Sequence, residues 1–354
     1  SKSVAVGYAS LSTQNFTTAT DGFNVAMGYE SGAAITTGLS NTLVGGQSGD
    51  ALTDADFNVA VGKEALTTDT LGSKSVAVGM GTLANQNFTT ATDSFNTAVG
   101  HIAGNAITTA RFNNLIGGLA GDALTTGNSN IAIGYNSLGS DTKGENSVAI
   151  GDQALATQNF TTATDTYNVA VGASAGNAIT TGVQNVIVGG LAGDALTDAD
   201  NNISIGFGSL TADTKGSRSV AIGSGALGTQ NFTTAVETNN IAIGVNAGLV
   251  ITTGVRNTLI GGNSGDSITD ADNNTGVGFN TLIANVLGSK SVAIGSFALE
   301  SQNPATATDM HNVAVGVSAG GAVTTGVNNT LIGALAGDAL TTAGNNVAIG
   351  YQAH

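Results

Sequence analysis

A five-residue segment ending in glycine recurs twenty times along this chain of 354 residues and constrains its fold more than any other feature. The first copies are Ser3–Gly7, Asn24–Gly28, Asn41–Gly45 and Asn58–Gly62. From Gly7 onward the steps between these glycines are 21, 17, 17 and 17 residues, which together make a unit of 72 residues. Self-similarity at a fixed period is the signature of a stacked repeat architecture. The pattern therefore predicts an all-β fold, a parallel β-solenoid of about twenty turns.

The 72-residue unit occurs almost five times and runs to both ends of the chain. Its copies span residues 1–72, 73–144, 145–216, 217–288 and 289–354. A solenoid grows in one dimension without splitting into domains. We therefore expect one continuous solenoid over residues 1–354, flanked by further segments of a fibre.

The residues before each glycine alternate in the manner of a β-strand. In the first copy Val4 and Val6 are β-branched and Ala5 between them is small, and most other copies follow this pattern. We expect the two β-branched residues to face the interior of the coil. The middle residue then faces outward although it is apolar, and the simplest cover for it is another copy of the chain.

The recurring glycine has a backbone reason, because a turn must follow each strand and glycine reaches positive φ at no steric cost. An Asn or Ser four places earlier can bond the backbone at the corner and form ladders between stacked turns. The second, weaker strand of each turn is expected after the glycine, for example at 34–37, 65–68 and 106–109. The glycines expected to hold the first turns are Gly7, Gly28, Gly45, Gly62, Gly79 and Gly100.

Composition and motifs argue against several classes of function. The chain has 24 acidic and 9 basic residues, a formal net charge of −15, and no basic patch for nucleic acid. It has no Cys, so it has no disulfide or thiolate chemistry. No stretch of 18 apolar residues and no charged-then-apolar leader occurs, so we expect no membrane insertion of this segment. His101, His311 and His354 lack metal-ligand spacing, and no nucleophile or phosphate-loop motif is present. We predict no enzyme, metal or cofactor.

Several segments resemble a known family. Ser-Val-Ala-Ile-Gly at 147–151, 219–223 and 291–295 resembles the repeat of YadA-like head domains of trimeric autotransporter adhesins. Asn-Asn-Val-Ala-Ile-Gly-Tyr-Gln-Ala at 345–353 resembles the related repeats of bacteriophage tail fibres. The resemblance covers the whole chain. It implies a left-handed parallel β-roll with one turn per repeat, three chains packed side by side, and surface attachment as the task.

The first turn of each unit carries four extra residues, around Gln14-Asn15-Phe16-Thr17 in the first copy. A solenoid accommodates such an insertion as a loop on one face. The loop could touch a ligand, or its Phe could cover the edge of the roll or pack on a neighbouring chain. In the fifth unit Pro304 replaces the Phe. The candidate receptor-contact or inter-chain residues are Asn15, Phe16, Asn87, Phe88, Asn159, Phe160, Asn231 and Phe232.

Two further patterns admit a ligand but favour a structural interpretation. Acids gather at Asp50, Asp54 and Asp56, with similar runs at 194–200 and 266–272. Calcium needs several convergent oxygens, yet the second and fifth units lack the later acids, so we favour turn-capping or solvated Asp. Columns of Thr, such as Thr36 and Thr53, are compatible with a flat surface that orders water and binds ice. The long turn interrupts the column, however, and cross-strand Thr pairs stabilise ordinary sheets.

These observations favour a structural and adhesive role. We expect a homotrimeric shaft in a phage tail fibre or similar appendage, located outside the cell on a virion or a bacterial surface. Its expected partners are a cell-surface receptor or glycan and the flanking fibre segments. The alternative is the head domain of a bacterial trimeric autotransporter adhesin, and a third, weaker interpretation is an ice-binding solenoid.

Overall fold

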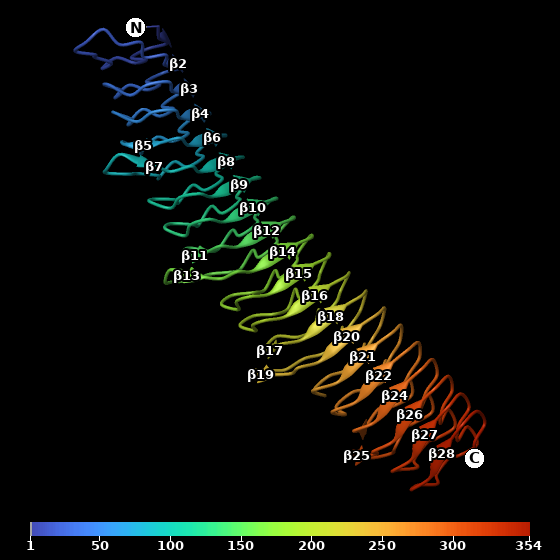
Figure 1. Cartoon of the computed structure of the whole chain (residues 1–354). Helices are drawn as coiled ribbons and strands as arrows, with labels where there is room; N and C mark the ends of the chain where they lie inside the picture. The colour runs from blue at the N-terminus through green and yellow to red at the C-terminus, as the bar shows by residue number, and fades with distance from the viewer. Residues whose placement is uncertain (1) are drawn as a thin grey trace. The chain divides into compact units, whose positions relative to one another are not determined.

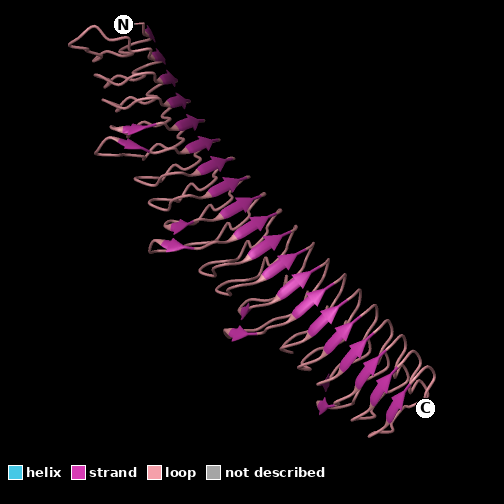
Figure 2. Ribbon diagram, in the orientation of Figure 1, coloured by secondary structure: helices cyan, strands magenta, loops and turns pink. Residues whose placement is uncertain are grey.

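The computed structural model describes residues 2–354, which form β-strands and turns but no helix. Those residues therefore contain no helix that could cross a lipid bilayer. The chain divides into two compact units, Ser1–Thr181 and Gly182–His354. Each unit is a stack of ten three-residue strands, one per turn (Figures 1 and 2).

The strands of the first unit share one parallel sheet, in which each strand pairs in register with the next, as Ala60 does with Ala77. They are β1 (Val4–Val6), β2 (Val25–Met27), β3 (Thr42–Val44), β4 (Val59–Val61), β6 (Val76–Val78), β8 (Thr97–Val99), β9 (Asn114–Ile116), β10 (Ile131–Ile133), β12 (Val148–Ile150) and β14 (Val169–Val171). Short paired strands lie beside the long turns: β5 (Gly72–Ser73) with β7 (Thr92–Asp93), and β11 (Gly144–Glu145) with β13 (Thr164–Asp165).

The second unit repeats this arrangement. Its principal strands are β15 (Val186–Val188), β16 (Ile203–Ile205), β18 (Val220–Ile222), β20 (Ile241–Ile243), β21 (Thr258–Ile260), β22 (Thr275–Val277), β24 (Val292–Ile294), β26 (Val313–Val315), β27 (Thr330–Ile332) and β28 (Val347–Ile349). The short pairs are β17 (Gly216–Ser217) with β19 (Val236–Glu237), and β23 (Gly288–Ser289) with β25 (Thr308–Asp309). Within each unit successive strands begin 17 residues apart, or 21 across a long turn. The prediction of a parallel β-solenoid with turns of about 17 residues is confirmed.

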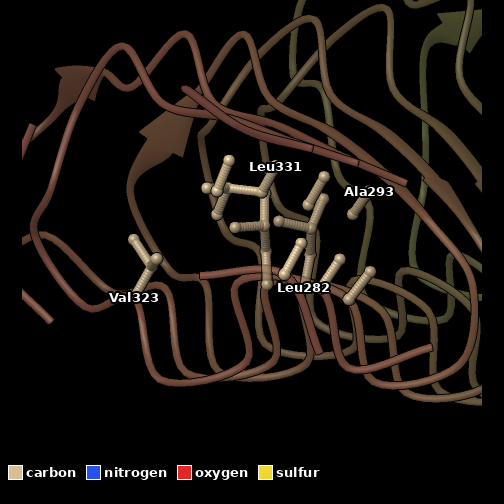
Figure 3. Close-up of a cluster of buried hydrophobic side chains, with 10 residues drawn as sticks. Leu282, Ala293, Val323 and Leu331 are labelled. Atoms are coloured by element: carbon tan, nitrogen blue, oxygen red, sulfur yellow. The ribbon is translucent and has the colours of Figure 1, made fainter. Parts of the chain in front are cut away.

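The expectation that Val and Ile fill the interior is wrong. The middle residue is buried in every principal strand after β1: Leu43 and Ala60 are fully buried, whereas Val61 is half-buried and Ile116 is 41% exposed. Figure 3 shows this interior in the second unit, where Leu282, Ala293, Val323 and Leu331 gather with other buried side chains. The β-branched residues therefore form the outer face of the sheet.

The narrow interior explains this orientation. A Cβ atom on Gly49 would lie 2.8 Å from the side chains of both Leu43 and Leu52, so these residues already fill the space. In the next turn Leu66 occupies the place of Gly49, and the polar Asp69 occupies the place of Leu52. Large and small residues thus exchange places between neighbouring turns and keep the filled volume constant. Two β-branched residues per strand would exceed the space that remains.

The second strands expected at 34–37, 65–68 and 106–109 are absent, and these residues lie in turns. The second and fourth residues after the glycine take left-handed backbone angles, such as φ 57° at Glu64 and φ 56° at Leu66. Alternating left-handed residues curl the chain, so an extended strand cannot continue there. Stacked turns still bond each other, as when the Thr36 N–H donates to the Thr53 carbonyl oxygen at 2.9 Å.

Two independent reasons require glycine at the end of each principal strand. In the six glycines from Gly7 to Gly100 named above, φ lies between 131° and 144°. An added Cβ would lie 2.3–2.5 Å from the carbonyl oxygen of the equivalent glycine in the next turn. Both the backbone angle and the approach of the stacked turns therefore exclude a side chain.

Buried asparagines form a ladder at the start of the strands. The Asn24 Oδ1 accepts the Asn41 backbone N–H at 2.9 Å, and the Asn41 Oδ1 accepts the Asn58 N–H at 2.9 Å. The Asn41 Nδ2 also donates to the Ala55 carbonyl oxygen at 2.8 Å. Each side chain thus satisfies backbone groups at a corner where the sheet has ended, because buried polar groups need partners.

Two adjacent glycines test the stacking geometry. Gly117 has φ 139°, and an added Cβ would lie 2.4 Å from the Gly134 carbonyl oxygen, whereas a Cβ on Gly118 would meet only the Tyr135 ring at 3.7 Å. We expect Gly117→Ala to lower the free energy of unfolding by at least about 3 kcal/mol and Gly118→Ala to change it by less than about 1 kcal/mol. Urea titration followed by far-ultraviolet circular dichroism measures both. Equal effects of the two variants would contradict the geometry.

Candidate binding site at the long turns

A buried polar network carries the ladder across each long turn. The Gln86 Nε2 donates to Asp69 Oδ2 at 2.6 Å and to Ser75 Oγ at 2.9 Å. The Asn96 Nδ2 donates to Gln86 Oε1 at 2.9 Å. All four side chains are at most 1% exposed. The same network recurs around the pairs Asp141–Gln158 and Asp213–Gln230. The four extra residues therefore enter without breaking the chain of buried hydrogen bonds.

The candidate residues of the long turns separate into buried rings and outer amides. Phe88, Phe160 and Phe232 are 5–7% exposed, and the Phe88 N–H donates to Asp69 Oδ1 at 3.0 Å. Phe16 is half-buried. Asn15, Asn159 and Asn231 are exposed, while Asn87 is half-buried and accepts the Thr70 hydroxyl at 3.2 Å. The three buried rings cover the edge of the roll. Of the eight candidate residues, only Asn15, Asn159 and Asn231 are exposed.

The fifth repeat departs from this network. Pro304 has no N–H to donate, and Asn285 occupies the place of the buried Asp. The Asn285 side chain bonds both backbone groups of Gly288, and the Gln302 Nε2 is left without a hydrogen-bond partner among residues 2–354. Pro304 therefore removes one of the hydrogen bonds that a carboxylate at the place of Asn285 would accept, as Asp69 accepts one from the Phe88 N–H.

A polar hollow lies beside β5 and β7 in the first unit and was not foreseen from the sequence. Its volume is about 580 Å³. The Lys74 Nζ lies 2.6 Å from Asp93 Oδ2, and the Arg111 Nε donates to the Asp93 carbonyl oxygen at 3.0 Å. The residues that line the hollow are Asp54, Asp56, Ser73, Ala91, Thr92, Asp93 and Arg111. It thus brings acceptors, donors and hydroxyls into one concave surface.

Opposing effects act on the pKa of Asp56, one of the acids that line the hollow. Burial raises the pKa of Asp56 by disfavouring the charged form, and the charges of Asp54 and Asp93 act in the same direction. The Leu39 N–H, which donates to Asp56 Oδ1 at 2.7 Å, opposes the rise. Asp54 accepts the Thr37 hydroxyl. These contacts join adjacent turns.

Exposed aromatic rings border this side of the first unit. They stand at the residue before the ladder Asn, and their side chains are 45–55% exposed. The Phe95 and Phe112 rings stack with centroids 5.8 Å apart. The Lys74 Nζ lies 5.2 Å from the Phe95 centroid, and the Arg111 Cζ lies 4.7 Å from that of Phe112. The exposed rings of this column are Phe23, Phe57, Phe95, Phe112 and Tyr167.

The second unit has a smaller hollow at the equivalent place, without the rings. It measures about 180 Å³ and lies beside β17 and β19. Asn201, Asn239 and Arg256 stand 144 residues after Phe57, Phe95 and Phe112. The lining residues are Asp200, Asn201, Ser217, Arg218, Ala235, Val236 and Glu237. The two hollows share an Asp and a Ser, at Asp56 and Asp200 and at Ser73 and Ser217. They differ in their volume, in their aromatic border and at Arg111, whose place is taken by Val255.

The outer face of each sheet is the other exposed feature. In the second unit Ile203, Ile260, Ile294 and Ile332 are 36–40% exposed, although they are aliphatic strand residues.

No group of three or more His, Cys, Asp or Glu side chains that could hold a metal ion occurs in the described part of the chain. No protein-family model matches the chain, and no curated protein shows significant similarity to it.

The buried Asp69 gives stability a pH dependence. Burial raises its pKa despite four hydrogen bonds that favour the carboxylate. A carboxyl with a raised folded pKa stabilises the fold below its unfolded pKa, and this contribution is lost as pH rises through the folded pKa. We expect the urea midpoint of the wild-type chain to fall as pH rises from about 4 to about 7. In Asp69→Asn the midpoint should fall less steeply.

The fourth repeat provides the reverse experiment. Asn285 occupies the equivalent place, so Asn285→Asp should add a pH dependence of the same sign. Parallel midpoint-against-pH curves for the wild type and both variants would show that this buried position does not titrate as described.

Proposed function

We propose that this chain is a structural and adhesive segment of a homotrimeric surface fibre, of the kind found in phage tail fibres. The observation that carries the proposal is the outer face of the sheets. Its Val and Ile side chains are aliphatic, regularly spaced and partly exposed in a single chain. Contiguous exposed apolar surface usually marks a protein interface.

The apolar outer face also revises the sequence argument for an oligomer. That argument assigned the outward position to the small middle residue, which is buried in the chain itself. The residues that need a cover are the β-branched ones on either side of it. A second and a third copy of the chain, packed along the strands, would remove these side chains from water at about 25 cal/mol per Å².

The stacked turns support the structural part of the proposal. Each turn is tied to the next by backbone hydrogen bonds and by the buried Asn ladder, so each unit has a regular hydrogen-bonded lattice along its stacking direction. The net charge of −15 favours solubility and disfavours association with nucleic acid. The same features suit the head of a trimeric autotransporter adhesin, the alternative interpretation. Sequence flanking this chain separates the two, because only the autotransporter has a membrane-anchoring barrel.

Assembly state tests the proposal. We expect sedimentation equilibrium to give the mass of a trimer. The double variant Ile203→Asp/Ile260→Asp places charges on the apolar face and should yield monomers with an unchanged far-ultraviolet spectrum, because an unpaired charge cannot be buried cheaply. Thr253→Asp adds a charge at an exposed turn residue and should leave the trimer intact.

A second double variant with uncharged side chains serves as a control in case the charged double variant misfolds. Ile203→Thr/Ile260→Thr keeps the β-branched shape that suits a strand and should still weaken the trimer. A monomeric wild-type chain at micromolar concentration, or trimers that survive both pairs of substitutions, would overturn the proposed assembly.

A further inference from the structure

The aromatic rings of the first unit stand where the backbone does not favour them. Phe95 and Phe112 have φ of 52° and 63°, in the left-handed region that bulky residues rarely adopt. Asn is several-fold enriched there, and the second unit has Asn239 in the place of Phe95. Both rings are nearly half exposed, so burial within the chain repays little of the conformational cost. The rings stack on each other and contact Lys74 and Arg111, and their exposed parts are available to another molecule.

Two cations link the exposed rings to residues of the polar hollow. Lys74 contacts both Asp93 and the Phe95 ring, and Arg111 contacts both the Asp93 backbone and the Phe112 ring. The rings therefore lie beside the hollow, with Lys74 and Arg111 between them and Asp93.

The chemistry of this surface selects a polyhydroxylated ligand. Carboxylates of Asp54 and Asp56 accept hydrogen bonds, the Arg111 guanidinium donates them, and Ser73 and Thr92 do both. Sugar hydroxyls donate and accept in the same way, and the C–H face of a pyranose packs against an aromatic ring. Three carboxylates against two cations leave the site slightly negative, which disfavours anionic ligands. The volume of about 580 Å³ is within the range of small-molecule sites.

We propose that the hollow bordered by Phe95 and Phe112 binds a short segment of a neutral saccharide. The inference deepens the adhesive part of the proposed function and rests on it. Asp54 and Asp56 accept hydrogen bonds from the sugar hydroxyls, Arg111 donates to them, and the two rings hold the apolar face of a sugar. The smaller hollow of the second unit has Val255 in place of Arg111, and Asn239 and Arg256 in place of the rings, so it does not bind the saccharide with comparable affinity.

The chain supplies its own matched variants. Phe95→Asn/Phe112→Arg gives the first unit the residues that the second unit already has at these corners. Asp56→Asn gives it the residue of the next repeat, where the Asn128 Oδ1 accepts the Arg111 N–H at 2.8 Å, so the structural hydrogen bond of this position is retained. Asn239→Ala/Arg256→Ala changes the equivalent corners of the second unit. Phe95, Phe112, Asn239 and Arg256 all lie at exposed corners.

The experiment uses the full chain on an array of neutral, sialylated and phosphorylated oligosaccharides, followed by saturation-transfer NMR and titration calorimetry with the neutral sugar that binds best. We expect binding of neutral oligosaccharides. The ring variant and Asp56→Asn should each weaken it about tenfold or more, and the second-unit variant should leave it unchanged.

Several outcomes would overturn the inference. They are no saturation transfer from any neutral sugar at millimolar concentration, binding of anionic sugars alone, and equal losses in the first-unit and second-unit variants. Sedimentation of the same samples keeps this test separate from the proposed assembly. A trimer that binds no neutral sugar would refute the proposed site and support the proposed assembly. A monomer that binds neutral sugar would support the site and refute the assembly.

Discussion

The close approach of stacked turns at the strand-ending glycines is the constraint on which the rest of the structure depends. A carbonyl oxygen of the next turn lies where a Cβ would stand, so only glycine permits the stacking distance. Each principal strand is three residues long and ends at this glycine, where the chain bends. The interior is narrow, and the middle strand residue shares it with buried turn residues such as Leu52 and Leu66. The β-branched neighbours are directed to the outer face.

The period of the glycine segments was enough to predict the fold class, the parallel stacking and the number of turns. The direction of the side chains was not predicted, because alternation with a period of two fits either face. The sequence did contain a usable signal. Gly49 and Leu52 of one turn are replaced by Leu66 and Asp69 in the next, so a large apolar residue appears at one place where it is lost from the other. Such an exchange indicates that these positions share a filled interior with the middle strand residue. The expected second strands failed because left-handed residues such as Glu64 are not recognisable from residue type alone.

The candidate site shows the same division. The long turns were recognised as an insertion, but sequence alone could not place their Phe rings, and three of them lie in the edge of the roll. The hollow was missed because its walls come from residues far apart in the sequence, such as Asp56 and Asp93, which stacking brings together. One signal could have pointed to it. The residue before the ladder Asn is often Phe or Tyr in the first unit, whereas the second unit has Asn or Arg at the equivalent positions.

The orientation of the strand residues is the central claim, and cysteine labelling tests it most directly because the chain has no Cys of its own. Ala132 is fully buried, and its neighbour Ile133 is half-buried on the outer face of β10. Maleimide should label Ile133→Cys in the native chain at concentrations where it is monomeric, and should label Ala132→Cys only after denaturation. Labelling of the native Ala132→Cys with protection of Ile133→Cys would show that the β-branched residues fill the interior, and would contradict the account.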